Sequence, residues 1–254
     1  TWGLGRLLWL LEKGIVMSGH AYYSYQSQAR GLNSNADVEA LTTAMFPVYD
    51  RLIPQWLPNR RDAAIYEIAC GPGIMLRYLT RSGYTNLRGS DSSECQIELA
   101  RSTGLVVNLA DSLSELKQHR ADNWDCLIAI DFVEHLPKDM LISFLGESHR
   151  TLKKGGVLIL RAPNGDSPLV GRNLFNDITH YWAYTTVATR ALLEMAGFKN
   201  IAFADEGIAS LQRHRWIKVP LMLLSQKLCR ILIRTATRED VRYLSPSIYI
   251  AAWK

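Results

Sequence analysis

The sequence predicts an α/β fold with a doubly wound, seven-stranded sheet that is mostly parallel and has an antiparallel last strand. Between about residues 60 and 204, short apolar runs alternate with longer helical patterns, which is typical of βαβ units. Several of these runs end in glycine or an acidic residue, where sheets of this kind bind their ligands. With 254 residues, 48% of them hydrophobic, the chain can bury one large core.

Each predicted element follows from its local pattern. Short apolar runs predict strands, and longer stretches with apolar residues three or four apart predict helices. The predicted strands are 63–69, 86–91, 105–110, 126–130, 157–160, 200–203 and 247–253. The predicted helices are 37–49, 74–81, 94–101, 140–152, 188–196 and 221–238. The residues 153–156, Lys-Lys-Gly-Gly, are predicted to form a turn, and Gly197 is predicted to end the helix before it.

The chain divides into an N-terminal helical or lid segment, residues 1–58, and a main domain, residues 59–254. A basic helical insertion at about 207–240 interrupts the main domain before its last strand. In the first segment, Tyr22, Tyr23 and Tyr25 suggest a lid over a bound ligand, and ordinary packing is the alternative. The first sixteen residues lack the cleavage site expected of a signal peptide.

Cysteine and hydropathy patterns exclude other classes. The four cysteines form no C-x-x-C pair, which predicts a reduced, cytosolic protein without a zinc site, and no metal site is predicted elsewhere. No apolar run reaches the length of about 18 residues that a membrane-spanning helix needs.

A glycine-rich turn follows the first predicted strand. Gly71 and Gly73 leave room for a ligand at the start of a helix, and Asp91 ends the next strand, twenty residues after Gly71. A carboxylate at that place can accept both hydroxyls of a ribose. Leu76 stands where a dinucleotide fingerprint would have its third glycine, so a nucleoside ligand without a pyrophosphate fits better than a nicotinamide dinucleotide.

Two more strand ends carry acids. Asp111 follows the third strand and Asp131 follows the fourth. Either one alone is as consistent with a helix cap as with a binding site. Acids at the ends of several neighbouring strands favour a binding site.

In five segments the chain resembles the class I S-adenosylmethionine (SAM) dependent methyltransferases, including those of bacterial glycan and lipid-linked pathways. The segments are E-I-A-C-G-P-G (67–73), G-S-D-S-S (89–93), N-L-A-D-S (108–112), W-D-C-L-I-A-I-D-F-V-E-H-L (124–136) and L-K-K-G-G-V-L-I-L-R-A-P-N (152–164). The resemblance covers roughly residues 60–204 and the last strand. It implies a Rossmann-like fold, SAM as cofactor, and residues 59–254 as the SAM-binding domain.

The resemblance also implies roles for individual residues. Glu67, Gly71 and Gly73 would surround the methionine part of SAM, and Asp91 would hold the ribose. Asp111 with Ser112 would face the adenine, and Asp131 with Phe132 would border the sulfonium. The predicted cofactor site also includes Ala69 and Ser92. Ala69 replaces a glycine usual in the family, and we expect it to adopt a strand-like backbone and leave binding intact.

The candidate catalytic residues lie in the polar, aromatic segment 176–185. His180 would accept the proton of an acceptor hydroxyl, and Asp177 would orient its imidazole. The alternative is that both residues brace the loop and cap the following helix. The D-x-T-H pattern of residues 177–180 resembles a segment of the glycan and lipid-linked methyltransferases, which favours the catalytic interpretation. His135 is interpreted as a packing residue.

Positive charge is concentrated in one segment. The whole chain carries a net charge of +5, yet 207–238 alone has seven basic residues and no acid: Arg213, Arg215, Lys218, Lys227, Arg230, Arg234 and Arg238. An apolar face beside a cationic stripe suits a helix on an anionic membrane surface, through residues 213–238. Packing on its own domain or on a twin subunit, as in a homodimer, is the alternative. The aromatic residues are not interleaved with the basic ones, which argues against nucleic acid.

These observations favour a SAM-dependent methyltransferase, an O-methyltransferase, that acts on a hydroxyl of a sugar, glycan or lipid-linked intermediate. We expect it in the cytoplasm, peripheral on the inner face of the membrane. One alternative is a soluble methyltransferase for a small aromatic or natural-product acceptor, which an apolar, aromatic-lined acceptor cavity would favour. Another is a SAM-binding regulatory subunit without turnover.

Overall fold

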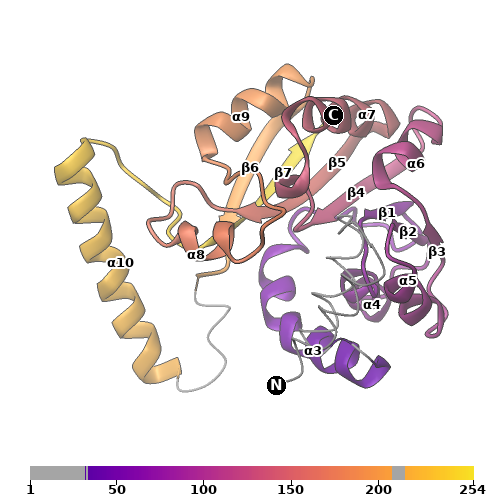
Figure 1. Ribbon diagram of the computed structural model, residues 1–254, viewed down its shortest axis with the longest axis horizontal. Coiled ribbons are helices and arrows are strands. Elements are labelled where there is room, and N and C mark those ends of the chain that lie inside the picture. The colour runs from indigo at the N-terminus through magenta and orange to yellow at the C-terminus, as the bar shows by residue number, and fades with distance from the viewer. Residues whose placement is uncertain (1–31, 33, 208–214) are drawn as a thin grey trace, which may run out of the picture.

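The computed structural model describes residues 32, 34–207 and 215–254, and within them a single sheet forms the centre of the molecule (Figure 1). Its strands are β1 (Ile65–Ile68), β2 (Leu87–Asp91), β3 (Val107–Leu109), β4 (Trp124–Ile130), β5 (Leu152–Pro163), β6 (Lys199–Asp205) and β7 (Ser247–Trp253). They lie in the order β3-β2-β1-β4-β5-β7-β6, and β7 runs antiparallel to both neighbours. The strands from β3 to β5 in this order pair in parallel. This arrangement confirms the predicted fold class.

Helices cover both faces of the sheet. They are α3 (Asn35–Leu52), α4 (Ile74–Arg81), α5 (Glu94–Arg101), α6 (Ser112–Gln118), α7 (Lys138–Thr151), α8 (Val170–Phe175), α9 (Thr186–Met195) and α10 (Arg215–Thr237), with a 3₁₀ turn, η1 (Val133–His135). The sequence analysis missed α6, α8 and η1, which have seven residues or fewer, because so short a segment shows little periodicity.

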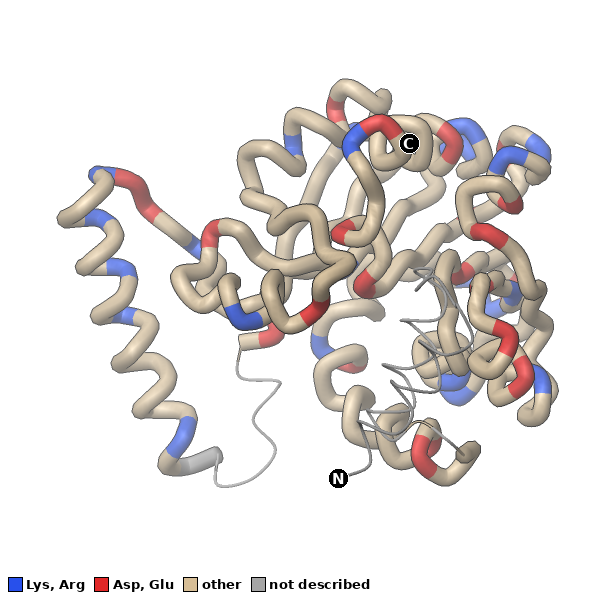
Figure 2. Tube along the Cα trace, in the orientation of Figure 1, with Lys and Arg blue, Asp and Glu red and all other residues tan. Residues whose placement is uncertain are grey.

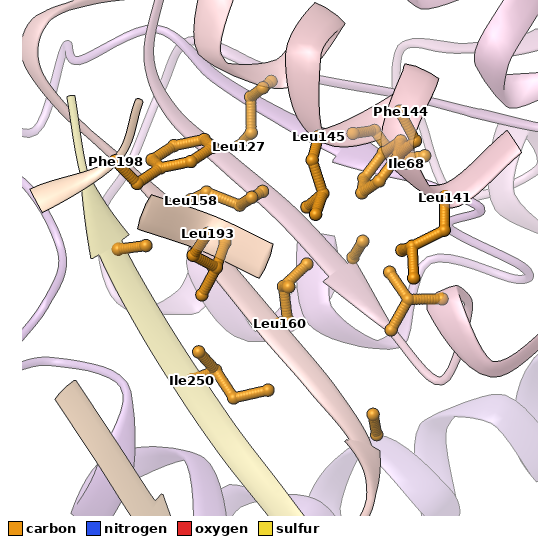
Figure 3. Packing of buried hydrophobic residues seen from close by; sticks show 14 of the residues in the cluster. Ile68, Leu127, Leu141, Phe144, Leu145, Leu158, Leu160, Leu193, Phe198 and Ile250 are labelled. Carbon is orange, nitrogen blue, oxygen red and sulfur yellow. The ribbon is translucent and has the colours of Figure 1, made fainter. Parts of the chain in front are cut away.

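The larger core lies between the sheet and the face covered by α6, α7 and α9 (Figure 3). Alternate strand residues such as Leu158 and Leu160 point to this side and belong to one cluster with Phe144 of α7 and Leu193 of α9. On the opposite face, α3 and α4 bury a second cluster around Tyr49 and Tyr78. The strands are apolar on both faces, as expected of parallel strands covered on both sides, and this holds their carboxyl ends in fixed register.

One predicted boundary is wrong. The residues 153–156, predicted to form a turn, belong to β5, which begins at Leu152. The backbone of Gly155 and Gly156 pairs with Lys254 at the end of the chain, and Gly155 has φ +76°. The Lys-Lys-Gly-Gly sequence therefore forms an irregular start to a strand and not a turn before one.

The protonation state of His119, a half-buried residue packed against Tyr66 and Trp124, affects stability. Trp124 donates its indole N–H to His119 Nδ1 at 3.1 Å, so this nitrogen must be unprotonated. Burial lowers the pKa of His119 below 6.5, so the unfolded chain takes up a proton there before the folded one does. We expect the free energy of unfolding to fall as pH drops below about 6.5. Chemical denaturation from pH 7.5 to 5 should show a smaller fall for His119→Gln; an equal fall in both proteins would contradict this.

The basic insertion forms the long helix α10, which stands away from the sheet (Figure 1). As described, it begins at Arg215, six residues before the predicted start, and includes Pro220. Its half-buried residues recur three or four apart, at Val219, Met222, Gln226, Cys229 and Ile233. These residues share one side of the helix.

A different side of α10 is apolar and exposed. Its residues are Ile217, Leu221, Leu224, Leu228, Ile231 and Leu232, each at least 50% exposed. The alternative that this face packs on its own domain is therefore wrong for the described residues. In the described part of the chain, no helix combines the length and hydrophobicity needed to cross a membrane.

Candidate functional site

A cavity of about 630 Å³ opens at the carboxyl ends of β1, β2 and β4, which is where sheets of this class bind ligands. Ten of the twelve predicted site residues line it: Ala69, Gly71, Asp91, Ser92, Asp111, Ser112, Asp131, Phe132, Asp177 and His180. They come from five separate segments of the chain. The structure therefore brings the candidate cofactor and catalytic residues to one cavity.

The structure does not bring Glu67 and Gly73 into the cavity wall. Glu67 lies inside β1 with 3% of its surface exposed, and burial raises its pKa well above the usual value. The backbone N–H of Leu76, at the start of α4, donates to the Glu67 carboxyl group. Through this hydrogen bond, Glu67 links β1 to the start of α4.

The turn after β1 requires unusual backbone conformations. Ala69 has φ +53°, so the expectation of a strand-like backbone at this position is wrong. A left-handed conformation costs an alanine roughly 1 kcal/mol, which explains why glycine would suit the position better. The strained turn aims the backbone of Gly71 into the cavity, and a Cβ atom at Gly71 would meet nothing within 4 Å.

Gly73 differs from Gly71 in that a side chain at this position would meet another residue. Its φ is +81°, and a Cβ atom there would lie 2.3 Å from Leu105 Cδ1. We expect Gly73→Ala to lower the free energy of unfolding by about 2 kcal/mol, from backbone strain and overpacking. Gly71→Ala, with open space around it, should cost about 1 kcal/mol. Denaturant unfolding of both variants measures the difference, and equal losses would show that the contact with Leu105 is readily relieved.

Asp91 joins the end of β2 to the glycine turn. Its Oδ2 accepts a hydrogen bond from Gly71 N at 2.8 Å, and its Oδ1 accepts one from Ser93 N at 2.8 Å. Each carboxylate oxygen has further acceptor capacity toward the cavity that Asp91 lines. This geometry suits a ligand with two adjacent hydroxyls.

Asp111 is both a helix cap and a cavity residue. Its Oδ1 accepts a hydrogen bond from Ser114 N at 2.9 Å and thereby caps α6. The cap fixes the start of α6, so that Asp111 and the buried Ser112 border the cavity together. Asp111 therefore caps a helix and also lines the cavity.

Asp131 forms an ion pair that the sequence analysis did not predict. Arg161, at the end of β5, donates to Asp131 and to Glu206, the latter at 2.7 Å. Asp131 has φ +53°, which turns the chain sharply after β4 and leads into η1. The sequence indicates an acidic partner for Arg161, because this residue is a single charge at the end of a buried apolar run.

Next to Asp131, three side chains form what we term the histidine cluster: Glu134, His135 and His180. One ligating atom of each lies within 4.8 Å of those of the other two. Burial raises the pKa of Glu134, and burial together with His180 lowers the pKa of His135 to about 4, so His135 is neutral at pH 7. His135, interpreted from sequence as a packing residue, also lines the cavity.

His180 has a defined tautomer. Its Nδ1 lies 3.0 Å from the carbonyl oxygen of Asn173 and 3.1 Å from that of Leu174. Because carbonyl oxygens only accept, Nδ1 carries the hydrogen, and Nε2 of the neutral ring is left as an acceptor. This Nε2 lies 4.0 Å from Glu134 Oε1.

The structure corrects the role predicted for Asp177. Its Oδ1 accepts hydrogen bonds from the Thr179 backbone N–H at 2.9 Å and from Thr179 Oγ1 at 2.6 Å. Thr179 Oγ1 in turn lies 2.8 Å from His135 Nδ1. Burial would raise the pKa of Asp177, but the bonds from Thr179 outweigh it and lower the pKa. Asp177 therefore orients Thr179 and His135, whereas backbone carbonyls orient His180.

The cavity wall beyond the histidine cluster is mixed, with apolar side chains at Leu136, Pro137 and Met140 and a polar group of four residues. It includes Asn173, Asn176, Arg161 and Ser247. Among the described residues that line the cavity, Phe132 is the sole phenylalanine, tyrosine or tryptophan. The candidate lid tyrosines, at 22, 23 and 25, lie outside the described residues.

This fold and cavity define the class of Rossmann-like proteins that bind a nucleoside at the strand ends. Residues 40–202 match the model of a methyltransferase domain family, and the chain belongs to that family. Its cofactor is S-adenosylmethionine.

The chain is similar to two curated proteins and to a solved structure. The chain is 26% identical over 66% of its length to a tRNA U34 carboxymethyltransferase of Pseudoalteromonas translucida, and 25% identical over 30% to a ubiquinone biosynthesis O-methyltransferase of Neisseria meningitidis. It spans 54% and 35% of the lengths of these two curated relatives. A SAM-dependent methyltransferase structure from Archaeoglobus fulgidus has the same fold, with TM-score 0.65, 19% identity, and coverage of 92% of this chain and 99% of that one.

The residues present fit this cofactor. The Gly71 backbone faces open space in the cavity, so a ligand can approach it closely. Asp91 has acceptor capacity for hydroxyls, and Asp111 with Ser112 offers polar contacts farther along the rim. The phenyl ring of Phe132 and the carboxylate of Asp131 lie in the wall between these residues and the histidine cluster.

Proposed function

We propose that this chain transfers the methyl group of SAM to a hydroxyl of a sugar, glycan or lipid-linked intermediate. When bound, SAM supplies an electrophilic methyl group. Asp91 would hold the ribose hydroxyls, and Asp131 with Phe132 would border the sulfonium, where a carboxylate and an aromatic face favour positive charge. Methyl transfer depends mainly on alignment, which the rigid strand ends supply.

The observation that carries this proposal is the histidine cluster at one end of the cavity. A hydroxyl must lose its proton when it is methylated, and His180 has an acceptor nitrogen there. We propose that His180 acts on the acceptor's proton and that Asp177 positions the loop through Thr179. The name of the curated ubiquinone relative also specifies O-methylation.

The chemistry of the wall supports a polar acceptor. Asparagine, aspartate and arginine side chains line the cavity together with the apolar Leu136, Pro137 and Met140, and such polar groups bind sugar hydroxyls. The alternative acceptor, a small aromatic compound, would be favoured by stacking rings, and Phe132 is the sole such ring in the described lining. The two curated relatives have names with different acceptors, so the acceptor is inferred from the site.

Product analysis tests the proposal. The protein is incubated with methyl-labelled SAM and separate membrane, glycan, small-molecule and RNA extracts, and products are identified by mass spectrometry. We expect label on a hydroxyl of a glycan or lipid-linked compound. Label on nitrogen, on RNA or on a small aromatic compound would contradict the acceptor class. SAM binding without transfer to any extract would favour a regulatory subunit.

We also propose that α10 holds the protein against an anionic membrane surface. Figure 2 shows basic residues along α10 and acidic ones only in the segment after it. Lys227, Arg230 and Arg234 fall on one stripe, next to the exposed apolar face. Apolar residues beside basic ones suit the boundary between lipid headgroups and acyl chains.

Vesicle binding tests the role of α10. Changing Lys227, Arg230 and Arg234 to glutamate should weaken binding to vesicles containing phosphatidylglycerol at least about 100-fold, since each basic residue near the surface contributes about 1 kcal/mol. The protein should bind phosphatidylcholine vesicles weakly throughout.

The matched control has three charge reversals elsewhere, at the exposed Arg88, Lys117 and Arg120. It should bind anionic vesicles more tightly than the α10 variant. Equal vesicle binding by both variants would contradict the membrane role. If the protein instead forms a dimer whose population rises with concentration, and changes in α10 disrupt that dimer, the apolar face binds a second copy of the chain.

A further inference from the structure

The histidine cluster contains a buried carboxylate with one oxygen that lacks a hydrogen-bond partner. Glu134 is 1% exposed, and its Oε2 has no hydrogen-bond partner in the described structure. A buried carboxylate oxygen without a partner is costly, so its retention needs an explanation. Its neighbours in the cluster are two imidazoles, His135 and His180, while Arg161, which also acts on the charge of Glu134, is paired with Asp131 and Glu206.

The donor types match a known class of metal site. Two imidazole nitrogens and one carboxylate oxygen form the protein ligand set of many catalytic sites for divalent transition metals, with further positions left for water or substrate. The three ligating atoms lie within 4.8 Å of one another, and His180 Nε2 is 4.0 Å from Glu134 Oε1. Donors of a tetrahedral zinc site lie roughly 3.3 Å apart, so binding requires the three side chains to close by about an ångström.

Groups behind the cluster already orient the two rings. His180 directs its Nδ1 hydrogen to the carbonyl oxygens of Asn173 and Leu174, which turns Nε2 toward Glu134. His135 Nδ1 contacts the Thr179 hydroxyl, which is itself held by Asp177. Histidines that bind metals are oriented by carbonyl or carboxylate partners in this way.

We propose that Glu134, His135 and His180 bind one divalent transition-metal ion, of which Zn²⁺ is the type, and that this ion contacts the acceptor hydroxyl. This inference rests on the proposed function, and it departs from the sequence-based expectation of no metal site. His180 then acts on the acceptor's proton through the ion rather than by accepting it. Asp177 is a positioning residue for His135.

Methyl transfer at this site needs no reactant besides SAM, the acceptor hydroxyl and water. The ion lowers the pKa of the hydroxyl, and the proton leaves to water. The oxygen's electron pair forms the new C–O bond, while the electron pair of the broken C–S bond stays on sulfur and yields S-adenosylhomocysteine.

Metal binding is tested on the untagged chain after dialysis against EDTA and removal of the chelator. Co²⁺ is added while visible absorption is recorded, because bands of bound Co²⁺ report on its ligands, and Zn²⁺ is titrated by calorimetry. We expect one equivalent to bind. Glu134→Gln, which keeps the shape of the side chain, and His180→Ala should each weaken binding at least 10-fold.

His149→Gln is the matched control, since His149 packs against Phe198 outside the cavity. It should bind Co²⁺ as the unchanged protein does, and thermal unfolding checks that each variant is folded. Absence of a stoichiometric site, or unchanged binding in His180→Ala, would overturn the proposal.

Methyl transfer separates this proposal from the proposed function. If EDTA abolishes transfer and Zn²⁺ restores it while SAM still binds, both stand. If transfer to the hydroxyl continues undiminished in EDTA and no ion binds, the metal site is wrong and the proposed function stands. If Co²⁺ binds at the cluster but no hydroxyl compound is methylated, the metal site stands and the proposed function fails.

Discussion

Replacing Asp91 with asparagine is expected to weaken SAM binding at least about 100-fold. The carboxylate accepts backbone hydrogen bonds on both oxygens, from Gly71 and from Ser93. An amide can offer only one oxygen, so its NH₂ group would face one of these N–H donors. It would also lose one charged acceptor for the ribose, and hydrogen bonds to charged groups contribute about 1.5–3 kcal/mol each.

Calorimetric titration with SAM measures this loss. The control is Asp205→Asn, because Asp205 also accepts two backbone hydrogen bonds, from Leu244 and Ser245, but lies outside the cavity. The control should bind SAM within about threefold of the unchanged protein. Tight binding by Asp91→Asn would mean that the ribose is held elsewhere.

Replacing His180 with alanine is expected to lower kcat at least about 100-fold and to leave SAM affinity nearly unchanged. A group that handles the acceptor's proton contributes typically 10²–10⁴ in rate. His180 lies at the end of the cavity beside Glu134, separated from the glycine turn and Asp91 by Asp131 and Phe132. The substitution therefore removes a group that acts on the acceptor and spares the cofactor contacts.

Steady-state kinetics with the acceptor found by product analysis, together with SAM calorimetry, checks this split. His149→Gln should keep its kcat, since His149 contacts Phe198 away from the cavity. If His180→Ala retains full turnover, His180 has no part in the reaction, and the polar end of the cavity serves binding alone.

Much of the fold could be predicted because the strands are buried on both faces. Runs such as 126–130 and 157–160 are continuous apolar segments, and a parallel sheet between two helical layers is the arrangement that buries them. Once the sheet is fixed, the ends of β1, β2 and β4 must share one edge. This is why residues far apart in sequence, such as Gly71, Asp91 and Asp131, line one cavity.

The remaining differences come from contacts that spacing does not encode. Asp177 and His180 are three residues apart and suggested a direct pair, but the turn directs Asp177 to Thr179 and His180 to backbone carbonyls. The left-handed backbone of Ala69 depends on the turn as a whole, because glycine-like conformations are rare for alanine. The histidine cluster joins η1 to the loop after α8, two segments that short-range patterns could not place together.

The central claim is that the strand ends hold SAM with its ribose at Asp91 and its sulfur near Asp131 and Phe132. A crystal structure with bound S-adenosylhomocysteine tests it most directly. We predict ribose hydroxyls within hydrogen-bond distance of the Asp91 carboxylate, adenine beside Asp111 and Ser112, and sulfur facing the histidine cluster. Density for the nucleoside in another part of the molecule, or in the reverse orientation along the cavity, would contradict the account.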